Sequence, residues 1–373
     1  MSRAVLKYEF NLRELSGAMG DFGTLIPLMA GYIVVCGLDP AALFITVGLV
    51  SIITGAVFKL PIPIEPMKVI AVVAIAQAWS PSMVYASGFV MGIIWIILSI
   101  SGFIEIISRY TPKPVIRGIQ VALGIMLIMQ AFNLVSSWWV LGIAALILAV
   151  LLRNNPYAPA VLVLMLAGIA LSVYQGIPAV EIGVKFTAPV FTSFNAADLW
   201  PVMLLAGFAQ VPLTATNAVL STQSLIKSYW PETSIKAKNI SLSIGIINLV
   251  IPFMGGMPIC HGAGGLTAKY LFGARTGGGN ILLGVIEVLA GLFFASVIAL
   301  VFSNFPEAII GALLFLIGFE LVKFARDIAR DWNIIILVIT VVLSVVVNMA
   351  IGFITGLAAY YIIEYTGSFR KQQ

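Results

Sequence analysis

Apolar stretches of membrane-spanning length follow one another along almost the whole chain. Dividing the sequence at its glycine, proline and charge clusters leaves about fourteen apolar segments. Most approach the roughly 17–25 residues that cross a bilayer as a helix, and several are distinctly shorter. Because 61% of the 373 residues are hydrophobic and only 9% are charged, a soluble domain is excluded. The sequence therefore predicts an all-α polytopic membrane protein in which some spans are discontinuous.

The basic residues predict how these spans cross the membrane. The predicted spans are residues 15–36, 41–58, 65–80, 82–107, 114–133, 137–152, 157–174, 198–225, 237–254, 261–272, 279–303, 306–323, 333–349 and 350–366. With a cytoplasmic N-terminus, 18 of the 20 basic residues lie on the cytoplasmic side, Lys269 among them, and the exceptions are Lys68 and Lys185. We expect a multi-pass protein of the cell membrane, in a bacterial or archaeal inner membrane, with both termini cytoplasmic. Since the basic residues are scattered, no nucleic-acid partner is expected.

The two halves of the chain share an order of features. Each half begins with an apolar segment that carries polar and small residues, GAMGDFGTLIPL from Gly17 and AGFAQVPLTATNAVL from Ala206. Each then has a short proline-containing stretch, LPIPIEPMKVIAVVAIAQ from Leu60 and GGMPICHGAGGLTAKYLF from Gly255. Seven spans per half is an odd number, so the second half must enter the membrane with the opposite orientation. This predicts a 7+7 inverted repeat with a binding site near the midplane.

Both proline-containing stretches predict a short extended strand that leads into a half-helix. Pro61, Pro63 and Pro66 disfavour helix through Glu65, so half-helix 3 should begin near Glu65. Half-helix 10 should begin near His261 in the same way. The two helix starts would then face each other, each with about half a positive charge and unpaired N–H groups. This arrangement suits an anion.

The second break contains the only histidine of the chain, His261, within a glycine-rich run. Broken backbone at membrane depth is tolerated where it lines a cavity or is buried in protein. His261 could be a packing residue, a proton carrier or an anion donor. Without a second histidine, and with Cys260 adjacent, a metal site is not expected. Gly262, Gly264 and Gly265 would allow a ligand to approach the backbone, or would serve helix packing.

Glu65 and Lys68 are three residues apart at a predicted helix start. They could face one cavity or form a plain ion pair. A protonated Glu65 beside an anion would couple uptake to a proton, because removal of the anion frees the carboxyl group to ionise. Glu287, in the middle of the predicted span 279–303, is a second proton-coupling candidate, with His261 as a third.

The segments that begin each half offer further polar candidates. Asp21 lies between Gly20 and Gly23, where the helix could unwind locally or pack closely, and it could also cap a helix. The matching segment of the second half offers uncharged donors, Gln210, Thr214, Thr216 and Asn217. Polar side chains also hold membrane helices together, so a purely structural role stays open for each of them.

Enzymatic functions find no support in the sequence. It contains no HExxH, GxSxG or GxxxxGK[ST] motif, and no second intramembrane aspartate is visible to pair with Asp21 for protease chemistry. No cofactor is therefore expected. The absence of an ATP-binding motif favours transport driven by an ion gradient.

The motifs GAMGDFGTLIPL, LPIPIEPMKV and PICHGAGGLTAKYLFGARTGGG resemble the molybdate transporter family, which is related to the sulfate permeases, from about Leu12 to the end of the chain. The resemblance implies a core domain of spans 1–4 and 8–11, residues 1–112 and 198–304. A gate domain would contain spans 5–7 and 12–14, residues 113–197 and 305–373. Sulfate permeases commonly carry a cytoplasmic regulatory domain after the last span, for which residues 367–373 are too short, and this favours the molybdate branch.

By motif, the resemblance implies an oxyanion site lined by Asp21, Thr24, Glu65, Lys68, Gln210, Thr214, Asn217, Cys260, His261, Gly262, Gly264 and Gly265. We expect secondary active import of molybdate and tungstate, coupled to protons, by movement of the core against the gate. A homodimer in the lipid bilayer is compatible with this reading. The alternatives are a transporter of sulfate or another oxyanion, a nucleobase:proton symporter, and a passive anion channel or electromotile protein.

Overall fold

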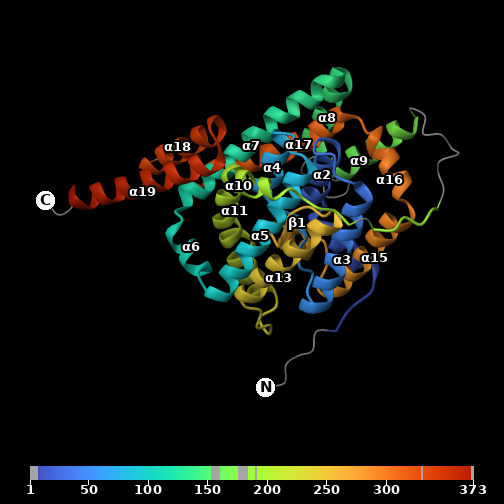
Figure 1. Ribbon diagram of the computed structural model, residues 1–373, viewed down its shortest axis with the longest axis horizontal. Coiled ribbons are helices and arrows are strands. Elements are labelled where there is room, and N and C mark those ends of the chain that lie inside the picture. Colours follow the sequence, from blue (N-terminus) through green and yellow to red (C-terminus); the bar gives the residue numbers. More distant parts are fainter. Residues whose placement is uncertain (1–6, 153–159, 175–183, 190, 329–330, 371–373) are drawn as a thin grey trace.

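The computed structural model describes residues 7–152, 160–174, 184–189, 191–328 and 331–370, and nearly all of its regular structure is helical (Figure 1). The first half contains α1 (Leu12–Ala18), η1 (Met19–Asp21), α2 (Phe22–Val34), α3 (Pro40–Phe58), β1 (Glu65–Pro66), α4 (Lys68–Ala76), α5 (Pro81–Ser101), α6 (Ile104–Tyr110), α7 (Lys113–Val135), η2 (Ser136–Trp138), α8 (Trp139–Leu152) and α9 (Ala160–Tyr174).

The second half repeats this order. It contains η4 (Ala196–Asp198), α10 (Leu199–Val202), η5 (Met203–Gly207), α11 (Phe208–Leu213), η6 (Thr214–Leu220), α12 (Ser221–Tyr229), α13 (Ala237–Val250), η7 (Ile251–Met254), β2 (Ile259–Cys260), α14 (Ala263–Leu271), α15 (Gly277–Phe293), α16 (Ala295–Ser303), α17 (Glu307–Val322), η8 (Lys323–Asp327), α18 (Trp332–Val346) and α19 (Met349–Arg370).

Helix lengths agree with a membrane protein that has discontinuous spans. Within the described residues, seven helical runs are long and apolar enough to cross a bilayer, or eight if the bent pair α15–α16 is counted as one span. The remaining crossings of the predicted fourteen have shorter apolar segments: α9, α18 and the part Met349–Glu364 of α19 are apolar helices, and α4 and α14 are half-helices of nine residues each.

Helix packing shows that the two halves are related reciprocally. α3, which precedes the strand β1, packs on α15, which follows the half-helix α14 of the other half. In the same way α13, which precedes β2, packs on α5, which follows α4. A second group forms where α7 packs on α17 and α18, and α18 and α19 lie side by side at one edge of the molecule (Figure 1). Each half therefore completes the packing of the other, as an inverted repeat requires.

The α3–α15 contact depends on small residues spaced seven apart. A Cβ added to Gly48 would lie 2.6 Å from the carbonyl oxygen of Gly284, and one added to Gly55 would lie 2.6 Å from that of Gly277. Ala41 and Gly291 meet one step further along, where the corresponding distance is 2.8 Å. Between membrane helices, where burial supplies little driving force, close backbone approach of this kind supplies the packing. We call these six residues the α3–α15 zipper.

Two spans contain local helix breaks. The first span narrows into the 3-10 turn η1 at Met19–Asp21, and a Cβ on Gly20 would lie 2.7 Å from the backbone of α14 at Ala268 and Lys269. The eighth span contains two π-helical segments, η5 and η6, on either side of Pro212. π-helical turns often mark functional positions in helices, and η6 contains Thr214 and Asn217.

The predicted eleventh span contains a sharp bend. α15 ends at Phe293 and the chain bends by 84° into α16, within the predicted range 279–303. The sequence did not indicate the bend because apolar composition continues through it. Residues of the preceding connection supply the missing partners: Thr187 N–H donates to the carbonyl of Leu292 at 2.7 Å, and Lys185 N–H donates to that of Phe293 at 3.1 Å.

Substitution of Gly284 by alanine should destabilise the protein, because the new Cβ would lie 2.4 Å from the carbonyl oxygen of Gly48 and the two helices would have to separate. Overpacking of this kind costs about 1–3 kcal/mol. Thermal unfolding of the purified protein in detergent should show a lower midpoint for Gly284→Ala. The matched control is Gly23→Ala, since a Cβ there meets no atom within 4 Å. Equal midpoints for the two variants would contradict the role assigned to the zipper.

Candidate functional site

Two short strands bring the starts of the half-helices together. β1 and β2 pair in antiparallel orientation, with Glu65 opposite Cys260 and Pro66 opposite Ile259, and Met67 N–H donates to the carbonyl of Pro258 at 2.9 Å. The prolines before Lys68 favour this extended backbone. Because the strands are antiparallel, α4 and α14 begin side by side and run in opposite directions. We call this region the strand crossing.

The start of α4 is closed by a side chain from the second half. Gln210 Oε1 accepts hydrogen bonds from the N–H groups of Val69 and Ile70, at 2.8 and 3.3 Å. Its Nε2 donates to Thr214 Oγ1 at 2.6 Å, which fixes the amide in this orientation. Gln210 and Thr214, both fully buried, therefore act here as a cap for α4, and its free N–H groups are taken by a neutral acceptor.

The start of α14 is covered by a carboxylate. A Cβ on Gly262 would lie 2.3 Å from Glu65 Oε2, and one on Gly265 would lie 2.5 Å from Oε1, so glycine is what leaves room for the acid. Lys68 Nζ pairs with Glu65 Oε2 at 3.0 Å. The Glu65 side chain is 2% exposed, whereas that of Lys68 is 18% exposed. The predicted ion pair forms, and it lies on the first turn of α14.

Open space adjoins this helix start. Gly264 is exposed, and a Cβ placed there would meet no atom within 4 Å. Thr24 and Asn217 are half-buried, and no hydrogen bond joins either one to Glu65 or Lys68 in the described part of the chain. The structure thus brings Glu65, Lys68, Gly262, Gly264 and Gly265 together.

His261 is engaged on both ring nitrogens. Its Nδ1 lies 3.0 Å from the carbonyl oxygen of Pro63, and its Nε2 lies 3.0 Å from Ser243 Oγ. Since a carbonyl can only accept, Nδ1 carries the proton and Nε2 accepts from the serine hydroxyl. The ring is fully buried, and Thr222 Oγ1 donates to the backbone carbonyl of His261 at 2.7 Å. These contacts match the packing role among its three predicted possibilities.

Cys260 lies opposite Glu65 in the strand pairing, and Glu287 lies on α15. Cys260 is buried with its Sγ 3.9 Å from the carbonyl oxygen of Pro66. Glu287 is buried in α15 against α3, where Ser51 Oγ donates to its Oε2 at 3.5 Å. Neither side chain lies on the first turn of α4 or α14.

Asp21 belongs to a buried network that the sequence only partly indicated. Its Oδ2 accepts from the N–H of Ile64 at 3.1 Å and pairs with Lys269 Nζ at 3.0 Å, and both side chains of the pair are 1% exposed. Lys269 also donates to Asn280 Oδ1, whose amide nitrogen donates to the carbonyl of Ile62 at 2.6 Å. Asp21 therefore binds the backbone of the extended segment and does not form a side-chain helix cap.

Lys269 was assigned to the cytoplasmic side with the other basic residues, and the structure instead places it inside the core, paired with Asp21. Its position eight residues after His261 on the predicted half-helix could have signalled this. Glu14 was also missed. Its buried carboxylate accepts from the N–H groups of Arg275 and Thr276, directly before α15. A carboxylate that binds a helix start from a distant segment leaves no motif in the sequence. Sequence alone could therefore not pair Glu14 with the start of α15.

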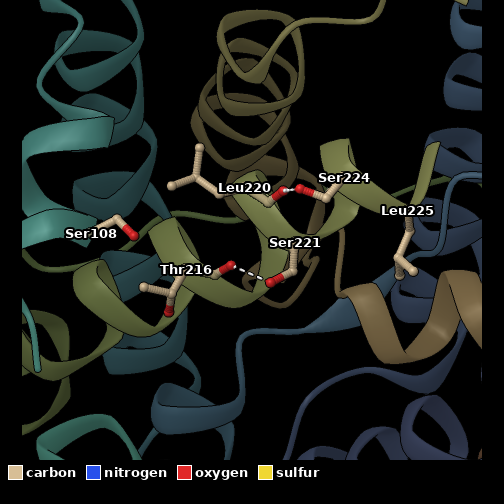
Figure 2. A pocket seen from close by; sticks show the side chains of 6 residues that line it. All are labelled: Ser108, Thr216, Leu220, Ser221, Ser224 and Leu225. Carbon is tan, nitrogen blue, oxygen red and sulfur yellow. Dashed lines mark hydrogen bonds between the residues drawn. The ribbon is translucent and has the colours of Figure 1, made fainter. Parts of the chain in front are cut away.

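A cavity of 540 Å³ lies next to the polar segment of the eighth span, lined by Ser108 of α6 and by Thr216, Leu220, Ser221, Ser224 and Leu225 (Figure 2). Ser221 Oγ donates to the carbonyl of Thr216 at 2.8 Å, and Ser224 Oγ donates to that of Leu220 at 2.9 Å. Their hydroxyl oxygens keep lone pairs free for water or solute. This open pocket between α6 and α12 therefore carries four hydroxyl groups on a partly apolar wall, next in sequence to Asn217.

Comparison with known proteins identifies relatives along the whole described chain. The family model described as "Molybdate transporter of MFS superfamily" matches residues 13–127 and 202–321. Molybdate transporter 1 of Arabidopsis thaliana is 30% identical over 410 residues, which cover 96% of this chain and 89% of the relative. Molybdate transporter 1 of Chlamydomonas reinhardtii is 27% identical over 467 residues, covering 92% and 90%.

Solved structures confirm the predicted fold class. The transmembrane domain of the cyanobacterial bicarbonate transporter BicA matches with a TM-score of 0.68 at 15% identity, over 95% of this chain and 99% of that one. The murine Solute Carrier 26 family member A9 anion transporter, in the inward-facing state, matches with a TM-score of 0.69 at 12% identity, over 96% and 69%. At these identities the likeness shows the architecture, the inverted-repeat bundle.

Replacing Lys269 by methionine should destabilise the protein strongly, because Asp21 would be left as an unpaired buried charge. Removal of one partner from a buried ion pair typically costs about 3–5 kcal/mol. The double variant Asp21→Asn/Lys269→Met should recover much of that loss, as measured by thermal or chaotrope-induced unfolding. Lys323→Met is the control, since its pair with Glu320 is exposed and contributes little. A double variant no more stable than Lys269→Met would refute the pairing as the cause.

Proposed function

The chain belongs to the molybdate transporter family, and we propose that it imports molybdate by secondary active transport. The observation that carries this proposal is the start of α14, where the ammonium of Lys68, 18% exposed, lies near Gly262 and a Cβ on the next glycine, Gly264, would meet open space. Lys68 contributes one positive charge, and each of the two helix starts contributes about half a charge. Together they supply about two positive charges, which match a tetrahedral dianion.

Tungstate is proposed as a second substrate because it has the same charge and shape as molybdate. Sulfate is also a tetrahedral dianion, so the charge of the site does not separate it from molybdate. Family membership supports molybdate, and sulfate therefore enters the test below as a competitor.

We propose that the anion is carried by movement of a core domain, residues 1–112 and 198–304, against a gate domain, residues 113–197 and 305–373. Packing supports this division: the pairs α3–α15 and α5–α13 lie within the core, and the pairs α7–α17 and α7–α18 lie within the gate. α4 packs on α7 and α2 packs on α17, so these contacts would form the sliding surface. α6 and α16 connect the two domains at corresponding places in the repeat.

The proposed orientation keeps both termini in the cytoplasm, as the distribution of basic residues predicts. Lys269 is buried and gives no information on orientation, but the other basic residues of the connecting segments still support cytoplasmic termini. Protons are the proposed coupling ion. Of the three candidates, His261 has both ring nitrogens engaged and Glu287 lies away from the helix starts, whereas Glu65 lies on the first turn of α14 beside Lys68.

Purified protein in proteoliposomes should accumulate radiolabelled molybdate when an inward proton gradient is imposed, and a protonophore should abolish the accumulation. Unlabelled tungstate should compete strongly, sulfate weakly and uracil not at all. Accumulation of uracil without molybdate would replace the proposal by a nucleobase symporter. Equilibration that never exceeds the external concentration would replace it by a channel.

Replacing Lys68 by methionine should weaken molybdate binding, because it removes the full positive charge that lies near Gly262 at the start of α14. Hydrogen bonds to charged groups contribute about 1.5–3 kcal/mol, so the half-saturating molybdate concentration should rise about 10–100-fold. Initial uptake rates over a range of concentrations measure this. Lys323→Met, which alters an exposed pair of the same i,i+3 spacing, should leave the value unchanged.

A further inference from the structure

Glu65 lies against the first turn of α14, where the proposed function places the transported anion. We propose that its carboxylate is a tethered substitute for the substrate, which offsets the charge of Lys68 while the carrier is empty and gives way when molybdate arrives. This inference rests on the proposed function and goes beyond it by assigning how the empty carrier recrosses the membrane.

The contacts place the carboxylate on the helix start itself. Both of its oxygens lie against the first turn of α14, one beside Gly262 and the other beside Gly265, and Lys68 Nζ pairs with Oε2 at 3.0 Å. β1 holds the backbone of Glu65 opposite Cys260, so the acid is tethered at this place. A dianion bound to Lys68 at this helix start would meet the carboxylate at close range, and the two would repel each other unless Glu65 were neutral.

The two helix starts are closed in different ways. At α4 the acceptor is the amide of Gln210, which is neutral, fully buried and held by Thr214. At α14 an ionisable carboxylate lies against Gly262 and Gly265, and Gly264 between them in the sequence is exposed. Only the second arrangement can be exchanged for a substrate, so the α14 start is the exchangeable anion site.

Charge balance then defines two states of the carrier. In the empty state, ionised Glu65 offsets the charge of Lys68. In the loaded state, the dianion balances Lys68 and both helix starts, so Glu65 takes up a proton and becomes neutral. One proton accompanies each dianion, and the proton leaves when Glu65 returns to the helix start. The other ionisable side chains that the structure describes near this turn have partners elsewhere: Asp21 and Lys269 pair with each other, and Glu287 faces α3. Cys260, opposite Glu65 in the strand pair, has its Sγ near the carbonyl oxygen of Pro66, and both ring nitrogens of His261 are engaged.

A Glu65→Gln variant separates this role from a structural one. Its loaded state keeps the charge balance of the wild type, but its empty state leaves Lys68 unpaired inside the membrane, which is costly. The variant should therefore move loaded but not return empty. It should exchange external for internal molybdate and fail in net uptake.

The experiment compares two fluxes in the same proteoliposomes with radiolabelled molybdate. Net uptake is measured into vesicles without molybdate, and exchange into vesicles filled with unlabelled molybdate. For Glu65→Gln the ratio of net uptake to exchange should fall by about tenfold or more relative to wild type, and its exchange should no longer depend on pH. Glu320→Gln is the matched control, because Glu320 forms an exposed pair with Lys323 at the same spacing, and its ratio should equal that of the wild type.

The outcomes of this experiment distinguish the inference from the proposed function. Net uptake retained by Glu65→Gln, or lost in parallel with exchange, would overturn the inference. Should the variant fail to fold, infrared difference spectra of the wild type decide: molybdate should produce the band of a protonated carboxyl group, and its absence would overturn the inference. A wild-type protein that moves no molybdate in either mode would instead refute the proposed function.

Discussion

Backbone groups in the middle of a membrane bundle need partners from the protein, because hydrocarbon supplies none. The strand crossing breaks two helices at that depth, and side chains from other spans satisfy the extended segments it exposes. Asn248 accepts from the N–H of Ile259 and donates to its carbonyl, Asn280 donates to Ile62, and His261 donates to Pro63. The polar residues of this core therefore hold two short strands in place, and the arrangement of both half-helices depends on them.

The need of these backbone groups for partners explains which features of the structure could be predicted from the sequence. The inverted repeat, the two breaks and the extended stretches before α4 and α14 were predictable, since proline placement and apolar length act locally. The contact partners of Gln210, Asp21 and His261 were not, because a polar side chain near a membrane break serves equally well as a substrate ligand or as a partner for backbone. Which role it takes depends on distances between segments about 40 to 250 residues apart, as the pairing of Asp21 with Lys269 shows.

The glycines of the site have two different structural roles, which the sequence does not distinguish. Gly262 and Gly265 are required by the acid that lies against them, whereas Gly264 faces open space. The spacing of GAGG on the helix could not reveal this, because the neighbour that distinguishes them, Glu65, comes from the other half of the chain. The prediction of a helix start suited to an anion stands on local physics, and the identity of the group that now covers it needed the packed structure.

The α3–α15 zipper packs a helix of one half closely against a helix of the other, beside both breaks. If these helices and the breaks move as one unit, the donors and charges around the ligand keep their mutual distances on either face of the membrane. The intrinsic affinity would then be the same inside and outside. A carrier built in this way has no preferred direction of its own, and the prevailing gradients alone would decide whether the cell gains or loses the ion.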